Sequence, residues 1–500
     1  MANLALNLVE AKDMYPDRAA VRLDDRILTY GQLDERSGRV ASLLTGLGVQ
    51  PGDRVALMLP NIPEFPVLYY GVLRAGATVV PMNPLLKARE VEFYLGDSGA
   101  RVIFAWHATA GESDKGAEAA GAHLVPVATE TFDRLLGEHA PLMAVSDLAD
   151  DATAVILYTS GTTGKPKGAE LTHANLRRNA AVSASTLFHL EPDDVVMGCL
   201  PLFHSFGQTC GLNAVVGSGA CLTLVPRFDP GKALEVIQRD RVTVFEGVPT
   251  MYVALLNHPE RGDYDVGSLR LCVSGGAALP VEVLRGFEEA FGCIILEGYG
   301  LSETSPVASF NHPGRERKPG SIGTPIEGVE IRVVDPAGQD VPAGGVGEIA
   351  IRGHNIMKGY WRHEQATGEA IPDGWFRTGD LACQDEDGYL FIVDRKKDLI
   401  IRGGYNVYPR EIEEVLYEHP AVAEAAVIGI PHATHGEEVG AAVVLKPGAE
   451  ATATELQAFC KERVAAYKYP RHVWLAAALP KTATGKLLRR EVQPPEGLSP

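Results

Sequence analysis

The residues best suited to chemistry lie at positions 158–168, directly after the short apolar run 154–157. The segment reads Tyr-Thr-Ser-Gly-Thr-Thr-Gly-Lys-Pro-Lys-Gly. Glycines let successive backbone N–H groups converge on an anion, and the hydroxyl and ammonium groups add further donors. Because the apolar run predicts a buried strand, we expect a polyphosphate-binding loop at the end of a core strand. The candidate phosphate-binding residues are Thr159, Ser160, Gly161, Thr162, Thr163, Gly164 and Lys165.

This segment is not a Walker A loop. That loop needs Gly-x-x-x-x-Gly-Lys-Ser/Thr, whereas the sixth position counted from Gly161 is Pro166, which follows Lys165. The other interpretation is a flexible surface turn, which so many phosphate-type donors after a core strand disfavour.

A second segment, Leu-Glu-Gly-Tyr-Gly-Leu-Ser-Glu-Thr at 296–304, also carries chemistry. Tyr299 lies between two glycines, an arrangement that lets its ring stack on a planar base. Glu303 offers a carboxylate, and Mg²⁺ typically takes one or two carboxylates together with phosphate oxygens. The alternative is a surface loop with a solvated glutamate, which the phosphate loop upstream disfavours.

Three further segments are weak signals when each is taken alone. In Trp-Phe-Arg-Thr-Gly-Asp at 375–380, the carboxylate of Asp380 suits two ribose hydroxyls. The charge run Asp-Arg-Lys-Lys-Asp at 394–398 is typical of a solvated turn. The segment Pro-Lys-Thr-Ala-Thr-Gly-Lys at 480–486 predicts a tight loop from which Lys486 projects.

In this order along the chain, the segments resemble the motifs of the adenylate-forming superfamily. That superfamily contains acyl-CoA synthetases, aryl-CoA ligases, luciferases and peptide-synthetase adenylation domains, and the resemblance covers essentially the whole chain. It is closest to bacterial medium- or long-chain fatty-acid–CoA ligases. The resemblance implies an acid–thiol ligase that uses ATP, Mg²⁺ and CoA and makes an acyl-adenylate before the thioester.

The resemblance also implies roles for single residues. Lys486 would stabilise the adenylation transition state, Thr304 would bond the α-phosphate, and Glu303 would hold the metal. His204 would orient the acid carboxylate or gate its pocket; the alternative is a structural histidine in a packed loop. Lys397 would be the hinge. The further residues implied are Gly276, Ala277, Glu297, Gly298, Tyr299, Gly300, Asp380, Arg395 and Asn406 for ATP or AMP, Arg402, Gly403 and Gly404 for CoA, and His204, Phe206, Gly207 and Gly298 for the acyl pocket.

The pattern of strands and helices predicts an α/β fold. Alternation through residues 18–105, continuing to about residue 300, predicts parallel βαβ units, and turn-separated strands at 329–334 and 346–352 predict a small β-barrel-like unit. We expect an N-terminal domain over 1–394, a hinge over 395–398 and a smaller mobile α+β domain over 399–500. A helix is expected to begin after Thr172 as N-cap, with its positive end toward the phosphates.

Composition narrows the class of protein. A chain of 500 residues favours two or more domains, and a net charge of −18 without a basic stripe argues against a nucleic-acid partner. The seven cysteines form no CxxC pair, and neither a secretory signal nor a transmembrane run is visible. These observations predict a cytoplasmic protein.

Two departures from related families bear on the acid. Gly298 stands where malonyl-CoA synthetases carry an arginine, which disfavours a dicarboxylate, and Ile401 stands where coumarate ligases and luciferases carry a lysine. The remaining interpretation is a medium- or long-chain fatty acid in an apolar tunnel. An aryl-CoA ligase is the nearest alternative. A carrier-loading adenylation domain is disfavoured because no carrier module follows residue 500 in the sequence, and a non-catalytic nucleotide or acyl-CoA binder is the alternative of another class.

Regulation and assembly stay open at this level. The segment 480–486 fits the Pro-x-x-x-x-Gly-Lys pattern on which related ligases are acetylated. Acetylation of Lys486 by a lysine acetyltransferase, reversed by a deacetylase, would remove the charge needed for adenylation. A homodimer is equally compatible with the sequence.

Overall fold

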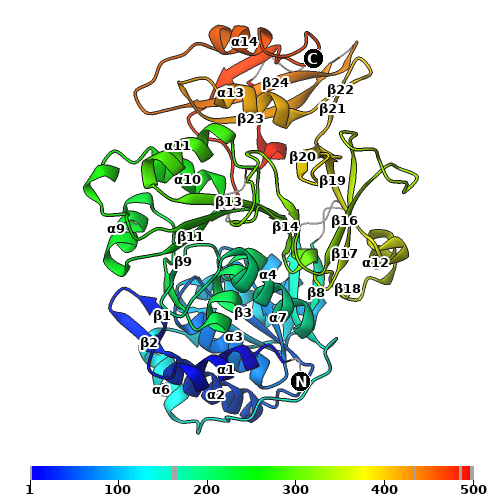
Figure 1. Cartoon of the computed structure of the whole chain (residues 1–500). Helices are drawn as coiled ribbons and strands as arrows, with labels where there is room; N and C mark the ends of the chain where they lie inside the picture. Colours follow the sequence, from blue (N-terminus) through cyan, green and yellow to red (C-terminus); the bar gives the residue numbers. More distant parts are fainter. Residues whose placement is uncertain (1–2, 160–165, 433, 483–486, 496–500) are drawn as a thin grey trace.

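The structure, a computed structural model, describes residues 3–159, 166–432, 434–482 and 487–495. A large part holds two extensive sheets covered by helices and a small sheet at one side, and a smaller part sits on top of it (Figure 1). Within the described residues, no helix is both long and apolar enough to cross a membrane.

The first large sheet has seven strands, and its central strands are parallel. β3 pairs in parallel with β4 and β5, and β4 pairs in parallel with β7, which confirms the predicted βαβ alternation. The order is β18 (Gly359–Tyr360), β8 (Lys167–Thr172), β7 (Thr153–Thr159), β4 (Thr78–Pro81), β3 (Arg54–Met58), β5 (Val102–Trp106) and β6 (His123–Val127).

The second large sheet has nine strands and holds much of the core. Its central strands are also parallel, and their buried runs of valine, leucine and isoleucine are typical of sheets covered on both faces. The order is β15 (Thr324–Pro325), β14 (Val307–Phe310), β13 (Ile294–Gly300), β12 (Leu271–Ser274), β11 (Val244–Gly247), β9 (Val195–Gly198), β10 (Cys221–Leu224), β1 (Ala19–Leu23) and β2 (Arg26–Thr29).

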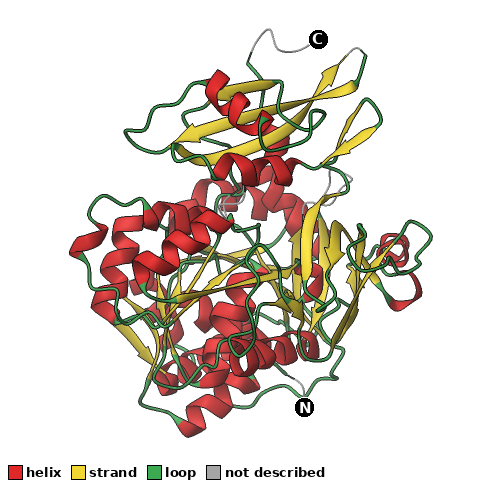
Figure 2. Cartoon of the chain, turned by 45° about the horizontal axis from the view of Figure 1, so that its top comes forward, coloured by secondary structure: helices red, strands yellow, loops and turns green. Residues whose placement is uncertain are grey.

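Helices of the large part cover these sheets (Figure 2). Local signals start several of them: Thr29 and Gln32 form a capping box for α2, and Asp229 caps α9 ahead of Pro230. Their bounds are α1 (Leu6–Met14), α2 (Tyr30–Gly46), α3 (Glu64–Arg74), α4 (Ala88–Ser98), α5 (Ala110–Ala120), α6 (Thr129–Gly137), α7 (His173–Val182), α8 (Ala214–Ser218), α9 (Pro230–Asp240), α10 (Pro249–Leu256), α11 (Val281–Phe291) and α12 (Glu364–Ala370).

β7 and β8 form an antiparallel pair, and the phosphate-loop segment connects them. Thr159 at the end of β7 lies opposite Lys167 at the start of β8, and residues 160–165 lie outside the described residues. Thr172 caps α7 as expected, because its side chain accepts a hydrogen bond from the backbone N–H of Asn175.

The expected direction of α7 is wrong. The six residues of β8 carry the chain about 20 Å from the loop before the helix begins. The backbone N–H of His173 donates to the carbonyl of Ala152, so the helix starts beside the first residues of β7. Its positive end therefore lies at the opposite end of the hairpin from the phosphate-loop segment.

The small β unit predicted after residue 328 is a four-stranded antiparallel sheet. Its path is β16 (Val329–Val334), β17 (Gly347–Gly353), β19 (Phe376–Gln384) and β20 (Leu390–Arg395). Asp380 on β19 lies directly opposite Arg395 on β20, so strand pairing brings two sequence-distant motifs together.

The smaller part is α+β and has its own core. Val427, Val439 and Leu456 are among its buried apolar residues, in a cluster distinct from the core of the large part. Its strands are β22 (Tyr405–Val407), β21 (Ile400–Arg402), β24 (Gly436–Leu445) and β23 (Val422–His432), with β25 (His472–Leu475) paired to β24, and its helices are α13 (Pro409–Tyr417) and α14 (Ala453–Lys461). The predicted capping box at Thr452 and Glu455 starts α14.

Charged contacts join the two parts next to the expected hinge. The guanidinium of Arg489 donates to Asp394 at 3.1 Å and to Glu413 at 3.0 Å. Arg410 on α13 donates to the carbonyl of Ile392 at 2.8 Å. These contacts hold the smaller part in one orientation over the large part.

Candidate active site

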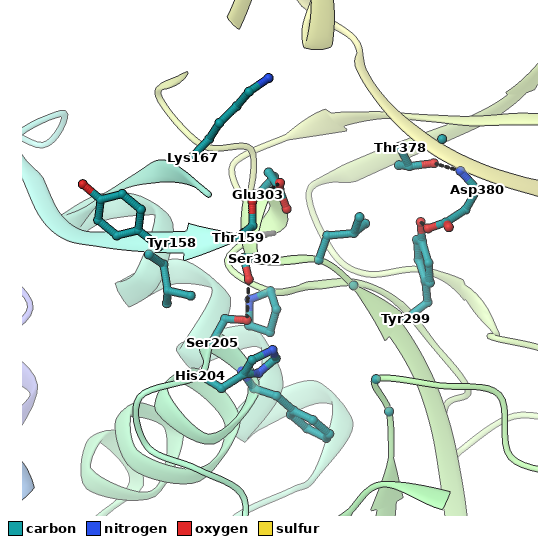
Figure 3. Close-up of a pocket in the computed structure, with 18 of the residues that line it drawn as sticks. Tyr158, Thr159, Lys167, His204, Ser205, Tyr299, Ser302, Glu303, Thr378 and Asp380 are labelled. Carbon is teal, nitrogen blue, oxygen red and sulfur yellow. Dashed lines mark hydrogen bonds between the residues drawn. The ribbon is translucent and has the colours of Figure 1, made fainter. Parts of the chain in front are cut away.

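A cavity of about 900 Å³ opens where the two large sheets, the small sheet and the smaller part meet. Its walls come from the ends of β7, β13 and β19 and from the loops after β9, β11 and β12. Side chains from these separate segments face a common space in Figure 3. Thr482, the last described residue before the segment that contains Lys486, also lines the cavity. Lys486 itself lies outside the described residues.

At one end, Asp380 is held by two groups from other elements. The phenol of Tyr299 on β13 donates to Oδ2 of Asp380 at 2.5 Å, and Nε of Arg395 lies 3.2 Å from Oδ1. Burial raises the pKa of Tyr299 well above its ordinary value, so the phenol stays protonated and remains a donor. The backbone N–H of Asp380 donates to the Thr378 hydroxyl at 3.1 Å (Figure 3). The structure thus brings together three residues predicted to bind the nucleotide.

Glu303 lies next to the phosphate-loop segment. Its carboxylate Oε1 accepts hydrogen bonds from the Thr159 hydroxyl at 3.3 Å and from the Tyr360 phenol at 3.0 Å. The carboxylate is 8% exposed and lines the cavity. An anionic oxygen beside a phosphate loop is the donor type that Mg²⁺ takes together with phosphate oxygens, so the residues present fit that metal.

Tyr360 also belongs to the site, although no motif in the sequence marks it. It lies on β18, opposite Ala169 of β8, so only strand pairing places it beside the phosphate loop. Burial, with Glu303 nearby, raises the pKa of its phenol, which therefore stays a donor. Nζ of Lys167 lies 5.4 Å from the centre of the Tyr360 ring.

Among the described residues, the cavity lining carries five basic residues and four acidic ones, although the chain is strongly acidic overall. One of the acidic residues, Glu348, accepts a hydrogen bond from the Gly379 N–H at 2.9 Å and lies 3.7 Å from Nζ of the basic residue Lys396. Basic side chains in a cleft attract the anionic groups of a substrate. The basic lining residues are Lys167, Arg377, Arg395, Lys396 and Lys397.

The other end of the cavity is largely apolar. His204 and Phe206 line it, and the backbone N–H of Phe206 lies 3.3 Å from Nδ1 of His204, which orients the imidazole. A Cβ at Gly298 would lie 2.0 Å from the Phe310 ring, so this glycine leaves room for that ring at the wall. Gly207 is not among the lining residues; a Cβ there would lie 2.4 Å from the Pro201 carbonyl, so it serves packing.

Several predicted site residues lie away from the cavity surface. Thr304 is fully buried, and its hydroxyl accepts from the Leu301 N–H at 2.8 Å. Glu297 is buried, and its carboxylate accepts from the Leu279 N–H at 3.0 Å. Gly276 lines the cavity, but its neighbour Ala277 does not.

The residues expected to contact CoA lie on the β21–β22 hairpin of the smaller part. Gly403 and Gly404 are exposed there, outside the cavity lining, and so is Asn406, which was expected at the nucleotide. Arg402 is paired with Glu438, its Nη2 donating at 2.9 Å. The smaller part thus presents Thr482 to the cavity and the expected CoA residues to solvent.

Comparison with known proteins agrees with this geometry. The family model described as AMP-binding enzyme matches residues 8–361, and that of the AMP-binding enzyme C-terminal domain matches residues 411–486. A long-chain-fatty-acid–CoA ligase of Bacillus subtilis (strain 168) is 39% identical over 97% of this chain and 93% of its own length. A feruloyl-CoA synthase of an Amycolatopsis species is 39% identical over 96% of each chain.

Among solved structures, the anthranilate CoA ligase AuaEII in complex with anthranoyl-AMP superposes with a TM-score of 0.92. It is 32% identical and covers 98% of this chain and 96% of its own. Two family models that together span most of the chain, and relatives that match it almost end to end, agree with the predicted motifs. The chain therefore belongs to the AMP-binding enzymes of the adenylate-forming superfamily and is an ATP-dependent acyl-CoA ligase.

Proposed function

We propose that the acid is a medium- or long-chain fatty acid. The observation that carries this proposal is a single cavity that joins the polar set around Asp380 and Glu303 to an apolar end at Phe206 and Gly298. Each buried CH₂ group contributes about 0.8 kcal/mol, so an alkyl chain gains affinity with every carbon that the apolar end accepts. Gly298 offers no cation for a second carboxylate.

In the first half-reaction, the acid carboxylate attacks the α-phosphate of ATP and pyrophosphate leaves. The residues around Asp380 hold the ribose, which fixes the α-phosphate relative to the acid carboxylate near His204. The basic lining residues and Lys486 oppose the charge that builds on phosphorus in a water-poor site. Mg²⁺ held by Glu303 would neutralise part of the phosphate charge when it is bound.

In the second half-reaction, the CoA thiol attacks the acyl carbonyl and AMP leaves. The expected CoA residues Gly403 and Gly404 face solvent in the present orientation of the smaller part, whereas Thr482 lines the cavity. We therefore propose that the smaller part turns at Lys397, which withdraws Lys486 and brings the Gly403–Gly404 turn to the cavity. The contacts of Arg489 and Arg410 would hold the first orientation.

An acid panel tests the proposed function. Acids from acetate through palmitate, with benzoate, coumarate and malonate, are scored by AMP release in the presence of CoA. We expect the highest kcat/KM for an acid between octanoate and palmitate, and AMP release that depends on both acid and CoA. A maximum at coumarate would establish the aryl alternative, to which the feruloyl-CoA synthase relative points. ATP–pyrophosphate exchange that no acid stimulates would leave only a nucleotide binder.

The hinge is tested separately by Lys397→Pro. Proline restricts φ at this position, so thioester formation from supplied acyl-AMP should fall while adenylate formation persists. Unimpaired thioester formation in this variant would contradict a hinge at Lys397.

A further inference from the structure

Glu246 is a buried carboxylic acid that neither half-reaction uses. It lies beside the apolar end of the cavity, where we propose that the substrate acid binds and which we call the acid end. Its side chain belongs to β11 and the residue is 1% exposed. Oε1 has no hydrogen-bond partner among the residues that the structure describes. A buried polar atom without a partner lowers stability and calls for a compensating role. Burial raises the pKa of Glu246 to about 8, so near neutral pH the group is protonated and can donate as well as accept.

Strand register places Glu246 directly beneath the cavity wall. Parallel pairing aligns Glu246 with Val273 on β12, and Val273 with Leu296 on β13; the pairing of Phe245 with Met197 puts Gly198 of β9 beside Glu246. Side chains two residues apart on a strand share a face. The residues two positions after Gly198, Glu246, Val273 and Leu296 all line the cavity; they are Leu200, Val248, Gly275 and Gly298.

The carboxyl is therefore the polar exception in an otherwise apolar row. Val248 is extended, so the face that Glu246 shares with it continues to the cavity wall. The side opposite the sheet is formed by the π-helical segment Gly207–Asn213, which starts directly after the lining residue Phe206. A Cβ at Gly211 of this segment would lie 3.4 Å from Oε2 of Glu246, so the glycine leaves room for the carboxyl. Glu246 is not itself a lining residue: it lies one row behind the lining, so an acid reaches its carboxyl only by extending past Val248.

We propose that Glu246 is a specificity-determining residue that hydrogen-bonds an oxygen at the far end of the acid, so that the enzyme prefers an acid with a distal hydroxyl over its unsubstituted counterpart. This inference rests on the proposed acid–CoA ligase function and narrows its substrate class. A site built around a polar group discriminates strongly against an analogue that leaves the group unpaired. An unsubstituted alkyl end would cover the carboxyl without bonding to it, whereas a hydroxyl can both donate to it and accept from it.

Matched pairs of acids test this inference. The straight-chain acids from hexanoate to dodecanoate, their ω-hydroxy counterparts, and the pair cinnamate and coumarate are assayed by AMP release with CoA present. For the wild-type enzyme, we expect the hydroxylated member to have a kcat/KM at least about tenfold higher in the pair whose length reaches Glu246. In Glu246→Leu the ratio should fall to one or reverse, and Glu246→Gln should keep part of it.

The ratio within one preparation does not depend on how much of a variant is folded, so partial misfolding leaves the test valid. Glu64→Gln is the matched control, because this buried carboxyl also has an oxygen without a partner among the described residues, pairs with Arg26 at 2.7 Å and does not line the cavity. It should leave the ratio unchanged. Equal kcat/KM for both members of every pair, or an unchanged ratio in Glu246→Leu, would overturn the role of Glu246 while the ligase function stands. Absence of acid-dependent AMP release with every acid would instead overturn the proposed function.

Discussion

The nucleotide end and the acid end of the cavity are built in different ways. At the nucleotide end, polar groups satisfy one another: Asp380 is held by Tyr299 and Arg395, and Glu303 by Thr159 and Tyr360. At the acid end, the wall is mostly apolar and glycine-lined, and Glu246, a buried carboxyl behind it, has an oxygen without a partner among the described residues. A preorganised polar set recognises a group common to all substrates of a family, whereas an unsatisfied group in an apolar wall can distinguish one acid from another.

The largest expected effect follows from removing Lys486, whose cation we propose acts at the nucleotide end in the first half-reaction. Lys486→Ala should lower the rate of adenylate formation about 10²–10³-fold, because one preorganised donor to the transition state is lost. Thioester formation from supplied acyl-AMP should stay within a few-fold of wild type. ATP–pyrophosphate exchange and acyl-CoA formation measure the two steps.

Lys481→Ala is the matched control on the same loop, since its ammonium pairs with Glu424 at 2.6 Å. It should retain both activities. An equal loss of both half-reactions in Lys486→Ala would contradict a role confined to the nucleotide end in the first step.

The next effect concerns the acid end alone. In Gly298→Ala the new Cβ would lie 2.0 Å from the Phe310 ring and push it into the cavity. We expect kcat/KM for the best acid to fall about tenfold to a hundredfold, because overpacking narrows the pocket, with little change in the KM for ATP. Gly96→Ala, where a Cβ meets nothing within 4 Å, controls for glycine replacement. If the KM for ATP rose by the same factor as kcat/KM for the acid fell, the two ends would not be functionally separate.

Asp380→Asn is the corresponding change at the nucleotide end. It removes the carboxylate that pairs with Arg395 and that we propose accepts hydrogen bonds from the ribose hydroxyls, so the KM for ATP should rise about tenfold, the usual cost of losing a charged hydrogen bond. The KM for the acid should change much less. Asp385→Asn, on the turn after β19 where the carboxylate pairs with Lys318, should leave both values near wild type. Parallel increases in both KM values in Asp380→Asn would count against separate ends.

The last effect concerns stability and its pH dependence, and it leaves the two half-reactions aside. Burial raises the pKa of Glu246 from 4.5 to about 8, and burial, opposed by Arg410, raises that of Glu297 to about 7. The folded protein holds protons that the unfolded chain gives up above its ordinary carboxyl pKa. The stabilising contribution is therefore complete below pH 4.5 and is lost as pH rises through 7 to 8. Denaturant midpoints across this range should fall with pH.

Glu246→Gln should flatten that slope and stabilise the protein at alkaline pH by a few kcal/mol, since a pKa shift of one unit corresponds to about 1.4 kcal/mol. The titratable groups nearest to Glu246 are Cys199, Cys210 and Tyr252, and burial raises the pKa of each, so they stay neutral over the same range. A midpoint that falls with pH equally in wild type and Glu246→Gln would show that this carboxyl is charged in the folded protein.

Much of the fold could be predicted because short local patterns in the sequence indicate many of its helices and strands. The apolar run before Thr159 is β7, the capping box at Thr452 starts α14, and the turn-separated strands after residue 328 form the small antiparallel sheet. The direction of α7 could not be predicted, because nothing in the phosphate-loop segment shows that six residues of β8 precede the helix. Propensity identifies an element, but pairing decides where its ends lie.

By itself, the sequence determined the nucleotide end: its residues stand in short contiguous motifs whose chemistry depends on neighbours in the chain. Only the tertiary structure decided the acid end and the orientation of the smaller part. Glu246 lies beneath Val248, Gly275 and Gly298 because the register of β9, β11, β12 and β13 aligns residues up to about a hundred positions apart. Tyr360 meets Glu303 for the same reason, since β18 pairs with β8 across nearly two hundred residues. Hydrogen bonds between strands set these neighbours, and no local pattern of side chains encodes them.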